Sequence, residues 1–161
     1  MQDMLKVMFV CLGNICRSPM AEAILVHKAR EKGLNLRTQS SGTAAYHIGE
    51  SPDHRTMQVL EANGIVFEHK AQQFRHSHFE EFDYVLVMDE NNQRDVQRLG
   101  NPKVNSKVYL MRSFDQIGDD LTVADPWYGD IRDFEECFDT LDRSIDGFIH
   151  FLVEKHESLK Y

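Results

Sequence analysis

The chain has 161 residues, of which 42% are hydrophobic and 27% are charged, and this balance is typical of a globular protein in water. Its formal net charge of −8 argues against nucleic acid as a partner, because nucleic-acid binding requires a basic face. The first residues, Met1-Gln2-Asp3, lack the basic start and long apolar region of a signal peptide, and the apolar run that follows is too short to cross a bilayer. We therefore expect a single domain over residues 1–161, cytoplasmic and without membrane insertion.

The first predicted strand covers residues 5–10, a largely apolar run of the kind that a sheet buries. A helix is predicted over residues 19–32, with Ser18 as its cap, Pro19 in its first turn and Gly33 as its stop signal. This segment therefore predicts a strand, a tight loop and a helix in direct succession.

The middle of the chain continues the alternation. A short, poorly apolar strand is predicted at 37–41, and Ser51-Pro52-Asp53 opens a second helix that Gly64 closes. The capping-box spacing of residues 77–80 predicts a short helical turn. A buried strand at 84–88 and a helix at 90–99 follow.

A further strand is predicted at 107–111, and the last helix is the most periodic element. Its apolar residues fall at steps of three and four: Phe134, Cys137, Phe138, Leu141, Ile145, Phe148, Ile149 and Leu152. Strands that alternate with helices predict an α/β fold in which helices cover both faces of a parallel sheet, a three-layer α/β/α arrangement. Ligands bind such sheets beyond the carboxyl ends of the strands.

At the end of the first strand, Cys11 and Arg17 are separated by five residues. Backbone N–H groups and the helix dipole attract anions at such a loop, and the same field favours the thiolate of Cys11. The planar guanidinium of Arg17 can donate two parallel hydrogen bonds to a phosphate, Gly13 permits a tight loop, and Ser18 can donate to a thiolate. The loop itself contains no acid for a leaving group.

Two other types of site do not match this sequence. The loop lacks the Gly-Lys-Ser/Thr ending of a Walker-type nucleotide loop. Cys11 and Cys16 have no further Cys/His pair at zinc-ligand spacing, and Cys137 is isolated on a predicted helix. Because the three cysteines are odd in number, we interpret them as thiols, at least one of them reactive, and not as a disulfide framework.

The run Val10-Cys11-Leu12-Gly13-Asn14-Ile15-Cys16-Arg17-Ser18-Pro19 resembles the signature loop of the low-molecular-weight protein tyrosine phosphatases. Downstream, Asp125-Pro126-Trp127-Tyr128-Gly129 resembles that family's acid loop. Other segments follow the family's pattern in the expected order: Ser41-Gly42-Thr43, Tyr46-His47-Ile48-Gly49, Pro52-Asp53-x-Arg55, His69-Lys70-Ala71 and Val87-Met88-Asp89. The resemblance spans nearly the whole chain. It implies a central four-stranded parallel sheet with a phosphate-binding loop at the end of the first strand.

The resemblance also implies an activity, the hydrolysis of protein phosphotyrosine and small aryl phosphates without a metal or other cofactor. Cys11 would attack phosphorus to form a phosphocysteine, and Arg17 and the backbone amides from Leu12 to Ser18 would hold the phosphate. Asp125 would protonate the leaving phenolate and then activate water. Tyrosine-phosphorylated proteins are the implied partners, and inorganic phosphate or vanadate the implied active-site ligands. The implied substrate-binding residues are Leu12, Gly13, Asn14, Ile15, Cys16, Ser18, Tyr46, Trp127 and Tyr128.

Three further roles follow from the resemblance. Asn14, Ser18 and His69 resemble a polar network that holds the loop in shape, which makes His69 structural and not the acid. Asp89 either pairs with Arg17 or caps the helix that follows, and the sequence favours neither role. In the resembling family the second loop cysteine can bond to the nucleophile, so we hypothesise a reversible Cys11–Cys16 disulfide that shields Cys11 from irreversible oxidation.

The sequence supports three alternative functions less well than phosphotyrosine hydrolysis. Thiol-dependent arsenate reductases have a similar loop but need additional cysteines, and only Cys137 lies outside the loop here. Protein arginine phosphatases typically carry Thr where this chain has Ile15, so the apolar Ile15 favours phosphotyrosine. A binding module with a dead site would not need Cys11, Arg17 and Asp125 together.

Overall fold

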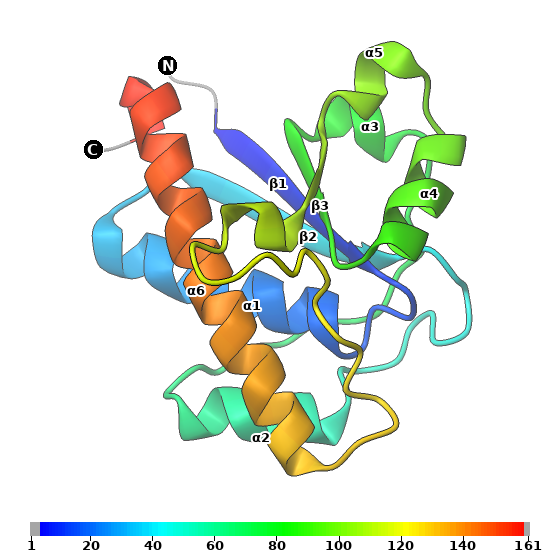
Figure 1. Ribbon diagram of the computed structural model, residues 1–161, viewed down its shortest axis with the longest axis vertical. Helices are drawn as coiled ribbons and strands as arrows, with labels where there is room; N and C mark the ends of the chain where they lie inside the picture. Colours follow the sequence, from blue (N-terminus) through cyan, green and yellow to red (C-terminus); the bar gives the residue numbers. More distant parts are fainter. Residues whose placement is uncertain (1–3, 160–161) are drawn as a thin grey trace.

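The computed structural model describes residues 4–159, so Met1-Gln2-Asp3, used above in the signal-peptide argument, lie outside the described residues. A parallel sheet of four strands in the order β2-β1-β3-β4 forms the centre (Figure 1). The strands are β1 (Leu5–Cys11), β2 (Leu36–Gly42), β3 (Tyr84–Val87) and β4 (Val108–Leu110). β1 pairs with a strand on each side, and helices cover both faces of the sheet, so residues 7–11 of β1 are buried, which explains its apolar sequence.

Helices lie on both faces of this sheet (Figure 1). They are α1 (Arg17–Lys32), α2 (His54–Ala62), α3 (His78–Glu81), α4 (Glu90–Arg98), α5 (Pro102–Asn105) and α6 (Ile131–Lys155), with 3-10 turns at Met111–Phe114 and Glu157–Leu159. None of the helices within residues 4–159 combines the length and the apolar character that a membrane span requires.

Two hydrophobic cores divide the molecule into layers. Alternate residues of β1 point to opposite sides, so Phe9 packs in one core with residues of α1, α2 and α6, including Phe148. Met8 packs in the other core with Phe79 of α3 and Val96 of α4. The predicted three-layer α/β/α fold and the four-stranded sheet implied by the resemblance are therefore confirmed.

The predicted elements are present, with corrections at their ends. Cys16, not Ser18, is the residue before the first turn of α1, and it makes no side-chain cap; the Ser18 hydroxyl lies inside the helix and bonds to other groups. Ser77 makes no capping bond at α3 either. The fourth strand is shorter than predicted, because the chain turns into a 3-10 helix at Met111. Helix α5 was not predicted.

Helix α6 holds the segment that leads to residue 125. The buried carboxylate of Asp115 pairs with Arg112 and with Arg143 of α6, each at 3.2 Å. Gly147 of α6 lies directly against the carbonyl group of Phe114, and any side chain there would collide with it. These contacts fix the 3-10 turn against α6. The connecting segment, residues 115–130, is therefore attached to α6 at both of its ends.

Candidate active site

Cys11 is the last residue of β1 and is 3% exposed. Its Sγ lies 3.0 Å from the hydroxyl oxygen of Ser18, and the backbone N–H of Asn14 donates to it over 3.3 Å. A thiolate only accepts hydrogen bonds, so in that form Ser18 must be the donor. Both contacts therefore stabilise the ionised, nucleophilic state of Cys11.

The loop between β1 and α1 (residues 12–16, the β1–α1 loop) is shaped by Asn14. This residue has a left-handed backbone (φ 60°), a conformation that is unfavourable for most residues other than glycine and that asparagine tolerates better than the rest. Its amide group donates to Ser18 over 2.8 Å, and its carbonyl oxygen accepts from the backbone N–H of Gln72 (2.9 Å) and from His69 (2.8 Å). Three hydrogen bonds thus hold the strained residue in place.

Asn14 and Ser18 were expected to bind substrate through their backbone amides, and the structure places both side chains beneath the pocket. Each is fully buried, and neither side chain lines the cavity. The two side chains belong to the polar network that the resemblance implied. Their positions depend on β2, because a Cβ at Gly42 would lie 2.7 Å from the carbonyl oxygen of Leu12. Only glycine lets β2 approach the loop this closely.

His69 supports Asn14 as a neutral ring. Since an amide oxygen only accepts, the Nε2 atom of His69 must carry the hydrogen that bonds to Asn14. Burial lowers the pKa of His69 to about 4. Burial also raises the pKa of Glu22, whose carboxylate accepts from Ser40 and Thr38 and lies 3.8 Å from the other ring nitrogen of His69.

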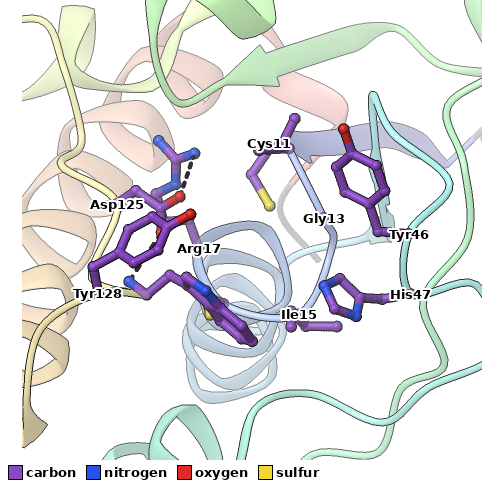
Figure 2. Close-up of a pocket in the computed structure, with 11 residues that line it drawn as sticks. Cys11, Gly13, Ile15, Arg17, Tyr46, His47, Asp125 and Tyr128 are labelled. Carbon is purple, nitrogen blue, oxygen red and sulfur yellow. Dashed lines mark hydrogen bonds and ion pairs between the residues drawn. The ribbon is translucent and has the colours of Figure 1, made fainter.

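Arg17 opens α1 and is 3% exposed, yet it lines the pocket. Its Nη1 donates to Asp89 over 2.8 Å and to the carbonyl oxygen of Val123 over 2.9 Å, while its Nη2 lies 3.6 Å from Asp125 (Figure 2). Burial alone would lower the pKa of Arg17, but Cys11 and the two carboxylates raise it. The guanidinium is therefore a fixed positive charge.

Asp89 performs both of the roles between which the sequence did not decide. One carboxylate oxygen pairs with Arg17, and the other accepts the backbone N–H of Asn92 over 2.8 Å, which caps α4. A carboxylate has two oxygens and can serve two donors at once. The start of α4 therefore orients the guanidinium of Arg17.

Asp125 reaches the same place from the segment before α6. Its carboxylate is 36% exposed, and one oxygen accepts the backbone N–H of Trp127 over 3.1 Å while the other faces Arg17. We call residues 125–129 the acid loop. The structure thus brings Cys11, Arg17 and Asp125 to one pocket from distant parts of the chain.

This pocket has a volume of about 360 Å³, within the range of small-ligand sites. Tyr46 and Tyr128, 74% and 94% exposed, stand on opposite sides of its mouth, with Cys11 between them in Figure 2. The lining residues are Cys11, Leu12, Gly13, Ile15, Cys16, Arg17, Tyr46, His47, Asp125, Trp127 and Tyr128. Apart from Asn14 and Ser18, every residue expected to bind substrate is among them.

His47 is a pocket residue that the sequence analysis did not single out. Its ring packs against Trp127 with centroids 5.7 Å apart, and its Nδ1 lies 2.8 Å from Glu50. The residue lies within the quoted Tyr46-His47-Ile48-Gly49 segment, but its type alone did not distinguish it from a surface histidine.

Cys16 also lines the pocket, while Cys137 is buried outside it. Burial raises the pKa of Cys16, and it raises that of Cys137 to about 12, so both are neutral thiols. Within residues 4–159, no three His, Cys, Asp or Glu side chains are grouped so that they could hold a metal ion.

Comparison with known proteins agrees with this geometry. The family model "Low molecular weight phosphotyrosine protein phosphatase" matches residues 6–158. The chain belongs to this family. A Saccharomyces cerevisiae phosphatase of the same description is 43% identical over 139 residues, which cover 83% of this chain and 86% of the yeast protein. The family and the enzyme class predicted from the sequence are thereby confirmed.

Solved structures share the fold of this phosphatase over almost its full length. A protein tyrosine phosphatase from Entamoeba histolytica superposes with a TM-score of 0.90 at 30% identity, covering 95% of this chain and 99% of the other. A Drosophila arginine phosphatase superposes with a TM-score of 0.86 at 29% identity, covering 91% and 97%. The fold is therefore shared by enzymes described as acting on two different phosphorylated side chains.

Replacement of His69 by glutamine should change how stability depends on pH. The unfolded histidine takes up a proton near its ordinary pKa of about 6.5, whereas the folded one resists until about pH 4, so His69 lowers stability as pH falls. Between pH 7 and pH 5 the wild type should lose about 2 kcal/mol more unfolding free energy than His69→Gln, measured by urea denaturation.

Two features make this comparison specific. Glutamine can still donate a hydrogen bond to Asn14. The raised pKa of Glu22 makes the folded protein more stable as pH falls, and it does so in both the wild type and His69→Gln. The control, His150→Gln, removes an exposed histidine on α6 and should follow the wild type. Parallel pH curves for wild type and His69→Gln would show that His69 is not held neutral.

Proposed function

We propose that this enzyme hydrolyses protein phosphotyrosine and small aryl phosphates through a phosphocysteine intermediate on Cys11. The observation that carries the proposal is the meeting of Cys11, Arg17 and Asp125 in one aromatic-lined pocket. A nucleophile, a cation for the phosphate oxygens and a carboxylic acid are the three groups that the reaction needs.

In the first step, the phosphate enters with its oxygens toward the guanidinium of Arg17, and Cys11 Sγ attacks phosphorus. The bond to the phenolic oxygen breaks as a protonated Asp125 donates its proton to that oxygen. The YwlE arginine phosphatase, a neighbour with a TM-score of 0.86, was solved as a cysteine-to-serine mutant with a phosphorylated active-site serine. That structure supports covalent transfer to a loop residue of this kind.

In the second step, the Asp125 carboxylate takes a proton from water as the water oxygen attacks phosphorus. The S–P bond breaks, the Cys11 thiolate is restored with Ser18 donating to it, and inorganic phosphate leaves. Arg17 supplies the positive charge throughout, so the proposal assigns no metal and no cofactor. Inorganic phosphate and vanadate are the expected ligands of the empty enzyme.

The pocket walls favour a phenyl ring over a guanidinium. Ile15, Trp127 and the two tyrosines at the mouth present apolar surface that a tyrosine ring can cover, whereas a phosphoarginine would bury polar N–H groups there. The similarity to arginine phosphatases keeps phosphoarginine as the second candidate substrate. Tyrosine-phosphorylated proteins, and not nucleic acids, are the proposed partners of a single catalytic domain in the cytoplasm.

The shielding disulfide is a further part of the proposal. Cys11 and Cys16 line the same pocket and are both free thiols in this structure. A peroxide that oxidises Cys11 would give a sulfenic acid, which Cys16 can convert to a disulfide with loss of water. Reduction by a thiol then restores the enzyme.

Cys11→Ser should abolish turnover of p-nitrophenyl phosphate, assayed without added metal, by on the order of a thousandfold or more. The serine hydroxyl is a far weaker nucleophile, but Arg17 still binds anions, so vanadate binding should be partly retained. Cys137→Ala is the matched control, because Cys137 is buried outside the pocket, and it should stay active. Appreciable turnover by Cys11→Ser would remove Cys11 as the nucleophile.

Asp125→Asn should reduce kcat/KM most for substrates with poor leaving groups. Phenolate needs the proton more than p-nitrophenolate does, so phenyl phosphate should lose roughly 100- to 1000-fold and p-nitrophenyl phosphate clearly less. Asp119→Asn, an exposed change in the same connecting segment, should have no effect. Equal losses for both substrates would mean that Asp125 is not the acid of the first step.

Substrate choice should depend on Ile15. The wild type should cleave phosphotyrosine with a kcat/KM at least about tenfold above that for phosphoarginine, because one apolar contact is worth roughly 1–3 kcal/mol. Ile15→Thr should narrow this ratio by giving the pocket wall a hydroxyl group. A wild-type preference for phosphoarginine would instead establish the second candidate.

A further inference from the structure

The segment Pro52-Asp53-x-Arg55 was singled out in the sequence, but the proposed mechanism does not use it. Neither Asp53 nor Arg55 lines the pocket. Both side chains are nevertheless largely buried, with exposed fractions of 7% for Asp53 and 23% for Arg55. Two charged side chains held this firmly at the edge of an active site require an explanation.

Arg55 holds the backbone of the acid loop. Its Nη1 donates to the carbonyl oxygen of Gly129 over 3.0 Å, and its Nη2 donates to that of Trp127 over 3.2 Å. The guanidinium also lies 4.3 Å from the ring centroid of Phe134, a fully buried residue of α6. Arg55 therefore joins the start of α2 to the acid loop and to α6.

Asp53 holds Arg55 from the other side. Its two carboxylate oxygens accept from Nε and Nη2 of Arg55, each over 3.0 Å, in a bidentate pair. Burial alone would raise the pKa of Asp53, but the hydrogen bonds from Arg55 lower it, so the pair is ionised. The backbone N–H of Asp53 donates to the carbonyl oxygen of Ile15 over 2.8 Å. A continuous chain of bonds thus runs from the β1–α1 loop to the acid loop.

The chain of hydrogen bonds from Asp53 and Arg55 ends on Trp127, the residue that orients Asp125. Trp127 donates its backbone N–H to the Asp125 carboxylate, while its backbone carbonyl is held by Arg55. The other anchor of Asp125 is Arg17 at 3.6 Å, which the proposed mechanism gives over to the substrate phosphate. When phosphate is bound, the hold through Trp127 remains.

We propose that Arg55, held by Asp53, is a positioning residue that keeps Asp125 in line with the leaving oxygen while Arg17 is occupied by phosphate. This inference rests on the proposed role of Asp125 as the acid. Arg55 uses its planar fork to serve three acceptor residues, and the single ammonium of a lysine cannot reproduce that geometry.

The test compares kcat/KM for phenyl phosphate and p-nitrophenyl phosphate in Arg55→Lys. An acid displaced by about 1 Å can cost on the order of 100-fold in rate, so phenyl phosphate should lose roughly 10- to 100-fold. The p-nitrophenyl ester, whose leaving group needs little protonation, should lose about threefold or less. A merely structural role would lower both values equally.

Two further variants accompany it. Asp53→Asn keeps a good helix cap and the backbone bond to Ile15 but weakens the hold on Arg55, so it should show the same substrate pattern with a smaller loss. Arg132→Lys changes an exposed arginine just beyond the acid loop and should leave both rates unchanged. Thermal melting of each variant confirms that the folded protein is being assayed.

A double-mutant cycle with Asp125→Asn distinguishes an effect of Arg55 that acts through Asp125 from an effect that is independent of it. If Arg55 acts through Asp125, Arg55→Lys should cost phenyl phosphate almost nothing further in the Asp125→Asn background. Independent, multiplicative losses would overturn the role of Arg55 and leave the proposed function intact. A single Asp125→Asn variant without leaving-group dependence would overturn the acid assignment, and this inference with it.

Discussion

The site depends on a buried asparagine in a left-handed conformation. Asparagine tolerates this conformation better than most residues other than glycine, and Asn14 is held in it by hydrogen bonds with Ser18, with His69 and with the backbone N–H of Gln72. Its conformation places its own backbone N–H against the sulfur of Cys11. The shape of the β1–α1 loop is thus imposed by the surrounding protein, as a preorganised site requires.

The charges show how an acidic protein can bind a dianion. With a net charge of −8, the chain repels phosphate at long range, so affinity must come from directed contacts. Arg17 is the cation of the pocket, and its two terminal nitrogens make different contacts. Asp89 accepts from Nη1 at 2.8 Å, whereas Nη2 lies 3.6 Å from Asp125 and is the nitrogen proposed to bond the phosphate. The short contact with Asp89 orients the guanidinium of Arg17, and the longer contact with Asp125 can give way to a ligand.

Much of the fold could be predicted because apolar periodicity and helix stop signals are local. The same holds for Cys11, Arg17 and Asp125, which belong to short contiguous motifs. The errors concern groups with partners far along the chain. Ser18 looked like a cap because Pro19 follows it, but its hydroxyl is taken by Cys11 and Asn14. The pairing of Asp89 with Arg17 and the hydrogen bonds from Arg55 to the acid loop join residues about 70 positions apart, which no local pattern encodes.

The distribution of the site over the fold has a consequence for synthesis. Cys11 and Arg17 lie at the end of the first strand and the start of the first helix, but the loop between them is held by His69 and Gln72, and the acid loop is held by α2 and α6. In a chain emerging from the ribosome, the proposed nucleophile Cys11 therefore appears long before the proposed acid Asp125 and the helix that supports its loop. We therefore expect the proposed activity only once α6 has docked and supports the acid loop.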